Sequence, residues 1–164
     1  MAEYWDLYDG AGQKTGEKHP RGTVVPRGRF HKVVHIWIQN SKGELLMQKR
    51  SDTVDNCPGE WATTGGSVQA GEEPLITAVR ELSEELGIAV LPEELEYCLT
   101  VRRTDAYCYV YVLRKDIPTE ALMLQESEVA AAEWMSVEMM ERMVEEGTMH
   151  QYVYREMMDN YLET

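Results

Sequence analysis

Three glutamates stand close together in the stretch from Gly65 to Ile88: Glu81, Glu84 and Glu85 are spaced i, i+3 and i+4. On a helix this spacing places the three carboxylates on one face, with Cβ atoms about 5–6 Å apart. Like charges at that distance repel one another, and a hard divalent cation between them would remove the repulsion. Mg²⁺ prefers oxygen ligands and is commonly shared between carboxylates and substrate phosphates. The spacing therefore indicates a Mg²⁺ site, with a solvated helix face as the alternative.

Residues next to this cluster have side chains or backbone groups that would complete such a metal site. Arg80 can orient a carboxylate through its planar guanidinium group. Gly66 allows a close approach of the backbone, so its carbonyl could be a further metal ligand. Glu72 lies where a loop enters the expected helix, beside the positive end of the helix dipole.

The whole stretch follows one spaced pattern. It reads Gly66, five residues, Glu72, seven residues, Arg80-Glu81-Leu82, one residue, Glu84-Glu85, one residue, Gly87-Ile88. This resembles the Nudix box, the shared motif of the Nudix hydrolases, at every specified position. A chance match is on the order of one in a billion per window at ordinary residue frequencies. The chain is therefore identified as similar to Nudix proteins.

The resemblance implies roles for individual residues. Glu81 and Glu85 correspond to metal ligands, with Glu84 assisting, and the box glycine, Gly66, corresponds to the residue that offers a backbone carbonyl. Arg80 corresponds to the arginine that orients the glutamates, which makes Arg80, Glu81 and Glu84 candidate catalytic residues. The implied cofactor is Mg²⁺, with Mn²⁺ as a substitute. The implied reaction is attack of water on a diphosphate phosphorus, with the metal neutralising the developing charge.

A candidate base lies outside the box. In MutT-type hydrolases a catalytic glutamate precedes an equivalent tryptophan by six residues, and counting back from Trp134 gives Glu128. Glu126 and Glu133 are the neighbouring alternatives, and a solvated loop acid is the alternative to a catalytic role. A glutamate that is not bound tightly to metal is the better proton acceptor, because its lone pairs are free.

The family resemblance implies a small-molecule substrate in which a nucleoside diphosphate is linked to another group, and we favour a nucleoside triphosphate. Trp37, Trp61 and Tyr107 are candidates for stacking on the substrate's base. Aromatic residues are also common in strands, so packing within the sheet is the alternative for each of them.

Two other functions stay open. Residues 30–50 also resemble isopentenyl-diphosphate isomerases, a branch of the same superfamily, and His31 corresponds to one of their metal ligands. His35 lies four residues further on, and a pair of ordinary hydrogen-bonded histidines is the alternative to a metal site. The isomerases carry a catalytic cysteine and a metal histidine in the stretch after Trp61, and this chain has neither there. The third function is a non-catalytic nucleotide sensor, a role usually accompanied by a degraded box.

Composition restricts the class of protein. The chain of 164 residues has a net charge of −13, which argues against nucleic acid as a partner, because binding phosphate backbones needs a basic face. It has no apolar run long enough to cross a membrane. Three cysteines without a paired spacing predict free thiols and a cytoplasmic location. The sequence leaves a monomer or a homodimer open.

The element pattern predicts one mixed α/β domain over residues 1–164. Residues 1–29 are expected to form an N-terminal hairpin extension around Asp9-Gly10, and residues 30–164 the core. Expected strands cover residues 31–39, 44–49, 97–103 and 106–114. Expected helices cover residues 73–86, 137–146 and 151–162. With the Nudix resemblance, this order implies an α/β/α sandwich around a mixed sheet.

Overall fold

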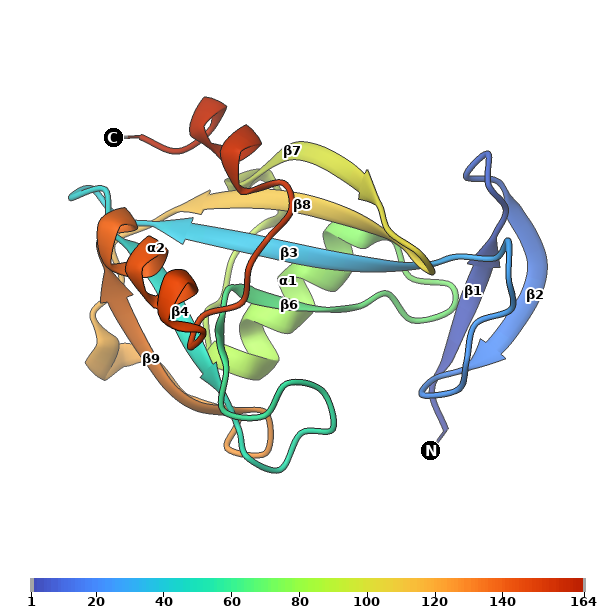
Figure 1. Ribbon diagram of the computed structural model, residues 1–164, viewed down its shortest axis with the longest axis horizontal. Helices are drawn as coiled ribbons and strands as arrows, with labels where there is room; N and C mark the ends of the chain where they lie inside the picture. The colour runs from blue at the N-terminus through green and yellow to red at the C-terminus, as the bar shows by residue number, and fades with distance from the viewer. Residues whose placement is uncertain (1, 164) are drawn as a thin grey trace.

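The computed structural model describes residues 2–163, so Met1 and Thr164 lie outside the description. The strands of this range are β1 (Tyr4–Tyr8), β2 (Lys14–Pro20), β3 (His31–Gln39), β4 (Leu45–Arg50), β5 (Trp61–Ala62), β6 (Thr64–Ser67), β7 (Leu95–Arg102), β8 (Ala106–Arg114) and β9 (Val129–Met135). The helices are α1 (Pro74–Leu86), α2 (Val137–Glu146) and the 3-10 helices η1 (Pro92–Glu94), η2 (Thr119–Ala121) and η3 (Arg155–Asn160). Figure 1 shows β1 and β2 apart from the other strands, at one end of β3.

A mixed sheet organises the molecule. Strands β5, β4, β3, β8 and β7 lie side by side in that order, while β6 pairs with β3 and β9 pairs with β4. The pairing of β3 with β8 is parallel, and the other pairings of this sheet are antiparallel. The expectation of a mixed sheet is therefore confirmed.

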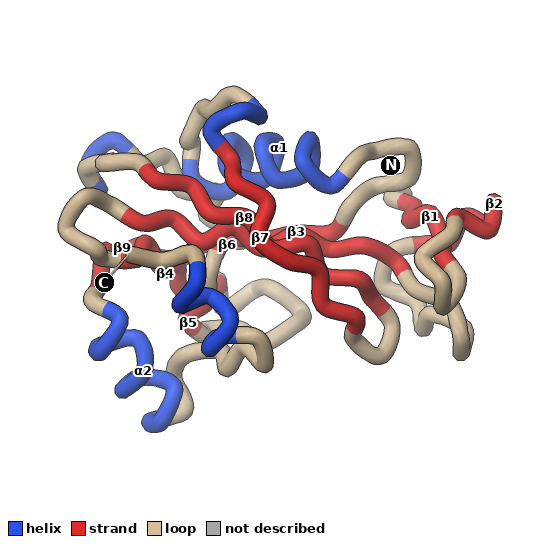
Figure 2. Tube along the Cα trace, turned by 90° about the horizontal axis from the view of Figure 1, so that it is seen from above, coloured by secondary structure: helices blue, strands red, loops and turns tan. Residues whose placement is uncertain are grey.

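The two faces of this sheet are covered by different elements. Along β3, Val34, Ile36 and Ile38 alternate with Trp37, so successive side chains point to opposite faces. The first three join the core beneath α1, and Trp37 joins the core beneath α2 and the C-terminal segment. Figure 2 shows α1 on one side of the strands and α2 on the other. The α/β/α sandwich predicted from the sequence is confirmed.

Helix α1 ends at the residue that the sequence indicates and begins one residue later than expected. Pro74 occupies its first turn, where a missing backbone N–H costs nothing. Gly87 ends it with φ 68°, a left-handed conformation that glycine adopts without strain, and its N–H donates to the Ser83 carbonyl at 3.0 Å. Leu82 and Leu86, one turn apart, are fully buried against the sheet.

The N-terminal hairpin forms as predicted. The Asp9 side chain accepts hydrogen bonds from the backbone N–H groups of Ala11 and Gln13, both at 2.9 Å, which closes the turn between β1 and β2. The hairpin attaches to the larger sheet through paired backbone groups of Tyr8 and Phe30, at 2.8 and 2.9 Å.

The predicted helix over residues 151–162 is wrong for half of its length. Only η3, Arg155–Asn160, is helical, and the residues before it are irregular. Tertiary hydrogen bonds account for the difference. The Tyr152 hydroxyl accepts from the Thr63 N–H at 2.9 Å, and the Tyr154 hydroxyl accepts from the Trp37 indole at 3.1 Å.

Three short strands, β5, β6 and β9, were not among the predicted elements. The three cysteines are unpaired, as expected. Within residues 2–163, no helix has the length and apolar character needed to cross a membrane.

Candidate active site

The box glutamates lie on one side of α1 but in different surroundings. Glu81 and Glu85 are almost wholly buried, with 9% and 8% of their surface exposed, whereas Glu84 is exposed to solvent. The i, i+4 spacing of the first two directs both carboxyl groups beneath β6 and β4. The structure therefore brings the predicted carboxylates together, with two of them removed from water.

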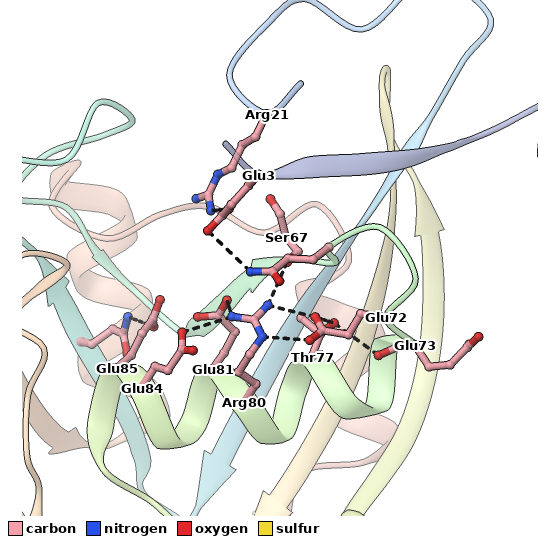
Figure 3. Close-up of polar contacts among 12 residues, drawn as sticks. Glu3, Arg21, Ser67, Glu72, Glu73, Thr77, Arg80, Glu81, Glu84 and Glu85 are labelled. Atoms are coloured by element: carbon pink, nitrogen blue, oxygen red, sulfur yellow. Dashed lines mark hydrogen bonds and ion pairs between the residues drawn. The ribbon is translucent and has the colours of Figure 1, made fainter. Parts of the chain in front are cut away.

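Arg80 connects the glutamates in one network, which Figure 3 shows in close-up. Its Nε and Nη2 atoms donate to the two carboxylate oxygens of Glu72, at 3.0 and 2.9 Å. Its Nη1 donates to Glu81 at 3.0 Å and to Glu84 at 3.1 Å. Arg80 thus contacts three glutamates, and the bidentate pair with Glu72 fixes the plane of its guanidinium group.

Glu72 is held from a second direction. The Thr77 hydroxyl donates to its carboxylate at 2.5 Å. Burial alone would raise the pKa of Glu72, but the hydrogen bonds from Arg80 and Thr77 outweigh that effect and hold the pKa below its usual range. Glu72 is therefore an ionised group that holds the guanidinium group of Arg80 through two hydrogen bonds.

Glu85 has a partner that the sequence did not reveal. The Gln48 side chain on β4 donates to the Glu85 carboxylate at 2.8 Å, and its own carbonyl accepts from the Thr64 hydroxyl at 3.0 Å. The amide N–H end of Gln48 therefore faces Glu85 on α1, and its carbonyl end faces Thr64. The one available signal was a polar residue, Gln48, directly after the apolar stretch Leu45–Met47.

The negative charge of the site is only partly compensated. Burial raises the pKa of Glu81 and of Glu85, and their mutual proximity adds to the effect on Glu85. Arg80 contacts Glu81, while the neutral Gln48 contacts Glu85. A divalent cation beside these carboxylates would favour their ionised forms, so the donor set fits a hard metal ion.

The side chains do not converge as a finished set of ligands. Among residues 2–163, no three histidine, cysteine or carboxylate side chains meet closely enough to hold a metal ion. Glu81 and Glu84 are instead drawn to the guanidinium group of Arg80.

The register of β6 changes one assignment. Val68 N–H donates to the Lys32 carbonyl at 2.9 Å, and Gly66 stands opposite Val34. Bonded pairs alternate along an antiparallel ladder, so Gly66 and Val34 form a bonded pair and the Gly66 carbonyl points into the sheet. The carbonyl of Gly65 points away from β3. Gly65 therefore replaces Gly66 as the candidate carbonyl ligand.

Gly66 is needed for a different reason. A Cβ atom at this position would overlap the carboxyl group of Glu81. The absence of a side chain lets α1 bring that carboxylate directly against β6, which is the close approach expected of a box glycine.

Glu128 lies in the turn between η2 and β9, and the backbone fixes this turn to the site. Gln125 N–H donates to the Glu85 carbonyl at 3.0 Å, and Ser51 N–H donates to the Glu128 carbonyl at 2.9 Å. The Glu128 side chain is exposed, and its charge contributes to the raised pKa of Glu85. The structure thus places Glu128 beside the buried carboxylates.

The three candidate stacking residues differ in how far contacts within the protein bury their side chains. Trp37 is fully buried and donates to Tyr154, so it has no surface with which to contact a substrate. Tyr107 packs against Phe30, with ring centroids 5.0 Å apart, and donates to a backbone carbonyl of the hairpin turn. Trp61 is partly buried at the edge of the core beneath α2.

The two histidines of β3 do not form a metal site. The His31 ring stacks on Trp5, with centroids 3.7 Å apart and the planes within 5°. His35 hydrogen-bonds through Nδ1 to the Tyr154 hydroxyl at 2.6 Å. Burial lowers the pKa of His31 to about 4 and that of His35 to about 3, so both rings are neutral near pH 7.

Known proteins share the sequence profile and the fold of this chain. The sequence profile of the NUDIX domain matches residues 29–157. A Nudix hydrolase of Listeria monocytogenes is 32% identical over 93% of this chain and 90% of its own length. Nudix hydrolase 3 of Arabidopsis thaliana is 36% identical over 83% of this chain, which spans only 19% of that protein.

A solved structure agrees with the whole fold. The structure of DR0079 from Deinococcus radiodurans superposes with a TM-score of 0.80, covering 97% of this chain and 99% of that one at 21% identity. At this identity the likeness shows the fold, whereas the profile match and the relatives show the family. The chain belongs to the Nudix family, whose hydrolases act on phosphoric anhydride bonds.

Proposed function

We propose that the protein is a Mg²⁺-dependent pyrophosphatase that hydrolyses a nucleoside diphosphate linked to another group, with a nucleoside triphosphate as the preferred substrate. The observation that carries this proposal is the pair of buried carboxylates, Glu81 and Glu85, beside an arginine that is already committed to Glu72. Uncompensated buried carboxylates are costly, and they are expected where a bound cation completes the site.

The proposed ligands are the carboxylates of Glu81, Glu84 and Glu85 and the backbone carbonyl of Gly65. Mg²⁺ bound there would screen the charge of the diphosphate and polarise its phosphorus–oxygen bonds. Mn²⁺, which takes the same kinds of oxygen ligand, is expected to substitute for it.

The remaining residues have supporting roles in this proposal. Arg80 holds Glu81 in place, and Gln48 does the same for Glu85. Glu128 accepts the proton from the attacking water, since it is exposed and makes none of the hydrogen bonds that occupy the buried glutamates. Trp61 and Tyr107 are the remaining candidates for contact with the nucleoside, and Trp37 is left out because it is buried.

A substrate panel with Mg²⁺ tests the proposal. Nucleoside triphosphates, dinucleotides and nucleotide sugars are incubated with the protein, and released phosphate or pyrophosphate is measured with and without EDTA. We expect hydrolysis that EDTA abolishes and Mg²⁺ restores. Hydrolysis that persists in EDTA, or no hydrolysis of any compound, would contradict the proposal. Isopentenyl diphosphate serves as a separate arm, in which formation of the dimethylallyl isomer would favour the isomerase instead.

A further inference from the structure

The turn Gln69–Glu72 connects β6 to α1. The backbone N–H groups of its two central residues point out of the turn. Glu72 N–H donates to the Gln69 carbonyl at 2.9 Å, and Gly71 has φ 82°. This is the pattern of a type II turn, whose third residue needs a left-handed conformation. The N–H groups of Ala70 and Gly71 have no acceptor inside such a turn, so their acceptors must come from outside it.

The N-terminal hairpin supplies both acceptors. Ala70 N–H donates to the backbone carbonyl of Tyr4 at 2.8 Å. Gly71 N–H donates to the carboxylate of Asp6 at 2.7 Å. Strand β1 therefore binds the outer side of the turn, although it lies outside residues 29–157, which match the NUDIX profile.

Asp6 is built to stay charged in this position. It is 6% exposed and accepts from Lys18 at 2.8 Å, with Lys14 at 3.3 Å on its other oxygen. Burial would raise the pKa of Asp6, but Lys18, the Gly71 amide and Lys14 outweigh burial and hold the pKa below its usual range. A hydrogen bond from an amide to an ionised carboxylate is about twice as strong as a neutral one.

The turn leads directly to the proposed metal ligands. Its last residue, Glu72, fixes the guanidinium plane of Arg80, and Arg80 holds Glu81 and Glu84. Figure 3 shows this row of contacts along α1. A shift of the turn therefore moves Glu72 directly, and it moves the carboxylates of Glu81 and Glu84 through Arg80.

We propose that Asp6 is a positioning residue for the metal-binding carboxylates, acting from the hairpin through the turn, Glu72 and Arg80. This inference rests on the proposed function, because it assumes that Glu81 and Glu84 bind Mg²⁺. It makes the hairpin a part of the active site's support rather than a separate appendage.

The test measures metal affinity directly, using Mn²⁺ and the electron paramagnetic resonance signal of the free ion. We expect the dissociation constant for Mn²⁺ to rise by about threefold to tenfold in Asp6→Asn and by roughly tenfold or more in Asp6→Ala, the scale of outer residues that orient metal ligands. The KM for substrate at saturating metal should stay unchanged, because Asp6 does not contact the substrate site.

Glu17→Ala is the matched control. Glu17 lies on the same hairpin, where it pairs with Arg29 on the exposed side and makes no contact with the turn. The Glu17→Ala variant should bind Mn²⁺ with the affinity of the wild type. Asp6→Asn in a Glu72→Gln background should add little further loss, because both changes act through the same contacts.

The outcomes separate the two proposals. Wild-type affinity in both Asp6 variants, or an equal loss in Glu17→Ala, would overturn the inference and leave the proposed function intact. A wild-type protein that binds no Mn²⁺ would overturn the proposed function and this inference with it. Should Asp6→Ala fail to fold, Asp6→Asn decides alone, and an affinity within twofold of wild type would count against the proposal.

Discussion

Glu85 is a proposed metal ligand, and its burial beside a neutral hydrogen-bond donor, Gln48, does not favour the metal-free fold. We predict that Glu85→Gln lowers turnover more than tenfold, a loss of at least about 1.4 kcal/mol of transition-state stabilisation. The metal-free variant should melt no lower than the wild type at pH 8, because the substitution removes a buried charge. Steady-state kinetics and thermal unfolding check both statements. More than a tenth of wild-type turnover in the variant would remove Glu85 from the ligand set.

Glu128 differs from Glu85 in being exposed and free of side-chain hydrogen bonds. If it is the general base, Glu128→Gln should reduce turnover by roughly a hundredfold to ten-thousandfold while the KM changes little. Glu126→Gln is the control from the same turn, and we expect it to keep wild-type turnover. The opposite result would transfer the role to Glu126, and equal activity in both variants would leave Glu81 as the remaining candidate.

The packing of helix α1 on strand β6 depends on Gly66. The absence of a side chain at this residue leaves room for the Glu81 carboxyl group of α1. We predict that Gly66→Ala displaces the Glu81 carboxyl group, destabilises the fold by about 1–3 kcal/mol and abolishes most of the activity. Gly10→Ala is the control, since a Cβ atom at Gly10 meets nothing within 4 Å. Urea unfolding and kinetics of the two variants decide the matter. Equal stability of Gly66→Ala and wild type would show that Glu81 can move without cost.

Across the whole molecule, the sequence was most informative where a local pattern determines the structure. Pro74 and Gly87 limit α1, and the Asp9 turn closes the hairpin, so both were predictable from neighbouring residues. Strand β6, with two glycines, has no strand pattern of its own and forms because β3 pairs with it. Gln48 reaches Glu85 across 37 positions of sequence, and no local pattern predicts such a contact.

The contact between the hairpin and the sheet gives global stability a pH dependence through His31. Its ring is 7% exposed, stacks on Trp5, and its Nδ1 has no hydrogen-bond partner. Burial lowers the pKa of His31 from 6.5 to about 4. Below pH 6.5 the unfolded chain therefore takes up a proton that the folded chain does not, and stability present above that pH is lost as the pH falls toward 4.

His31→Phe keeps a ring on Trp5 and removes the titrating group. We predict that the two proteins have similar free energies of unfolding at pH 7.5 and that the wild type is about 2 kcal/mol less stable than the variant at pH 5, the linkage expected for one group over this interval. Urea unfolding at a series of pH values measures the difference. Because the carboxylates are common to both proteins, their titration cancels in the comparison. A difference that does not change between pH 7.5 and 5 would mean that His31 titrates normally, and that water reaches the contact between the hairpin and the sheet.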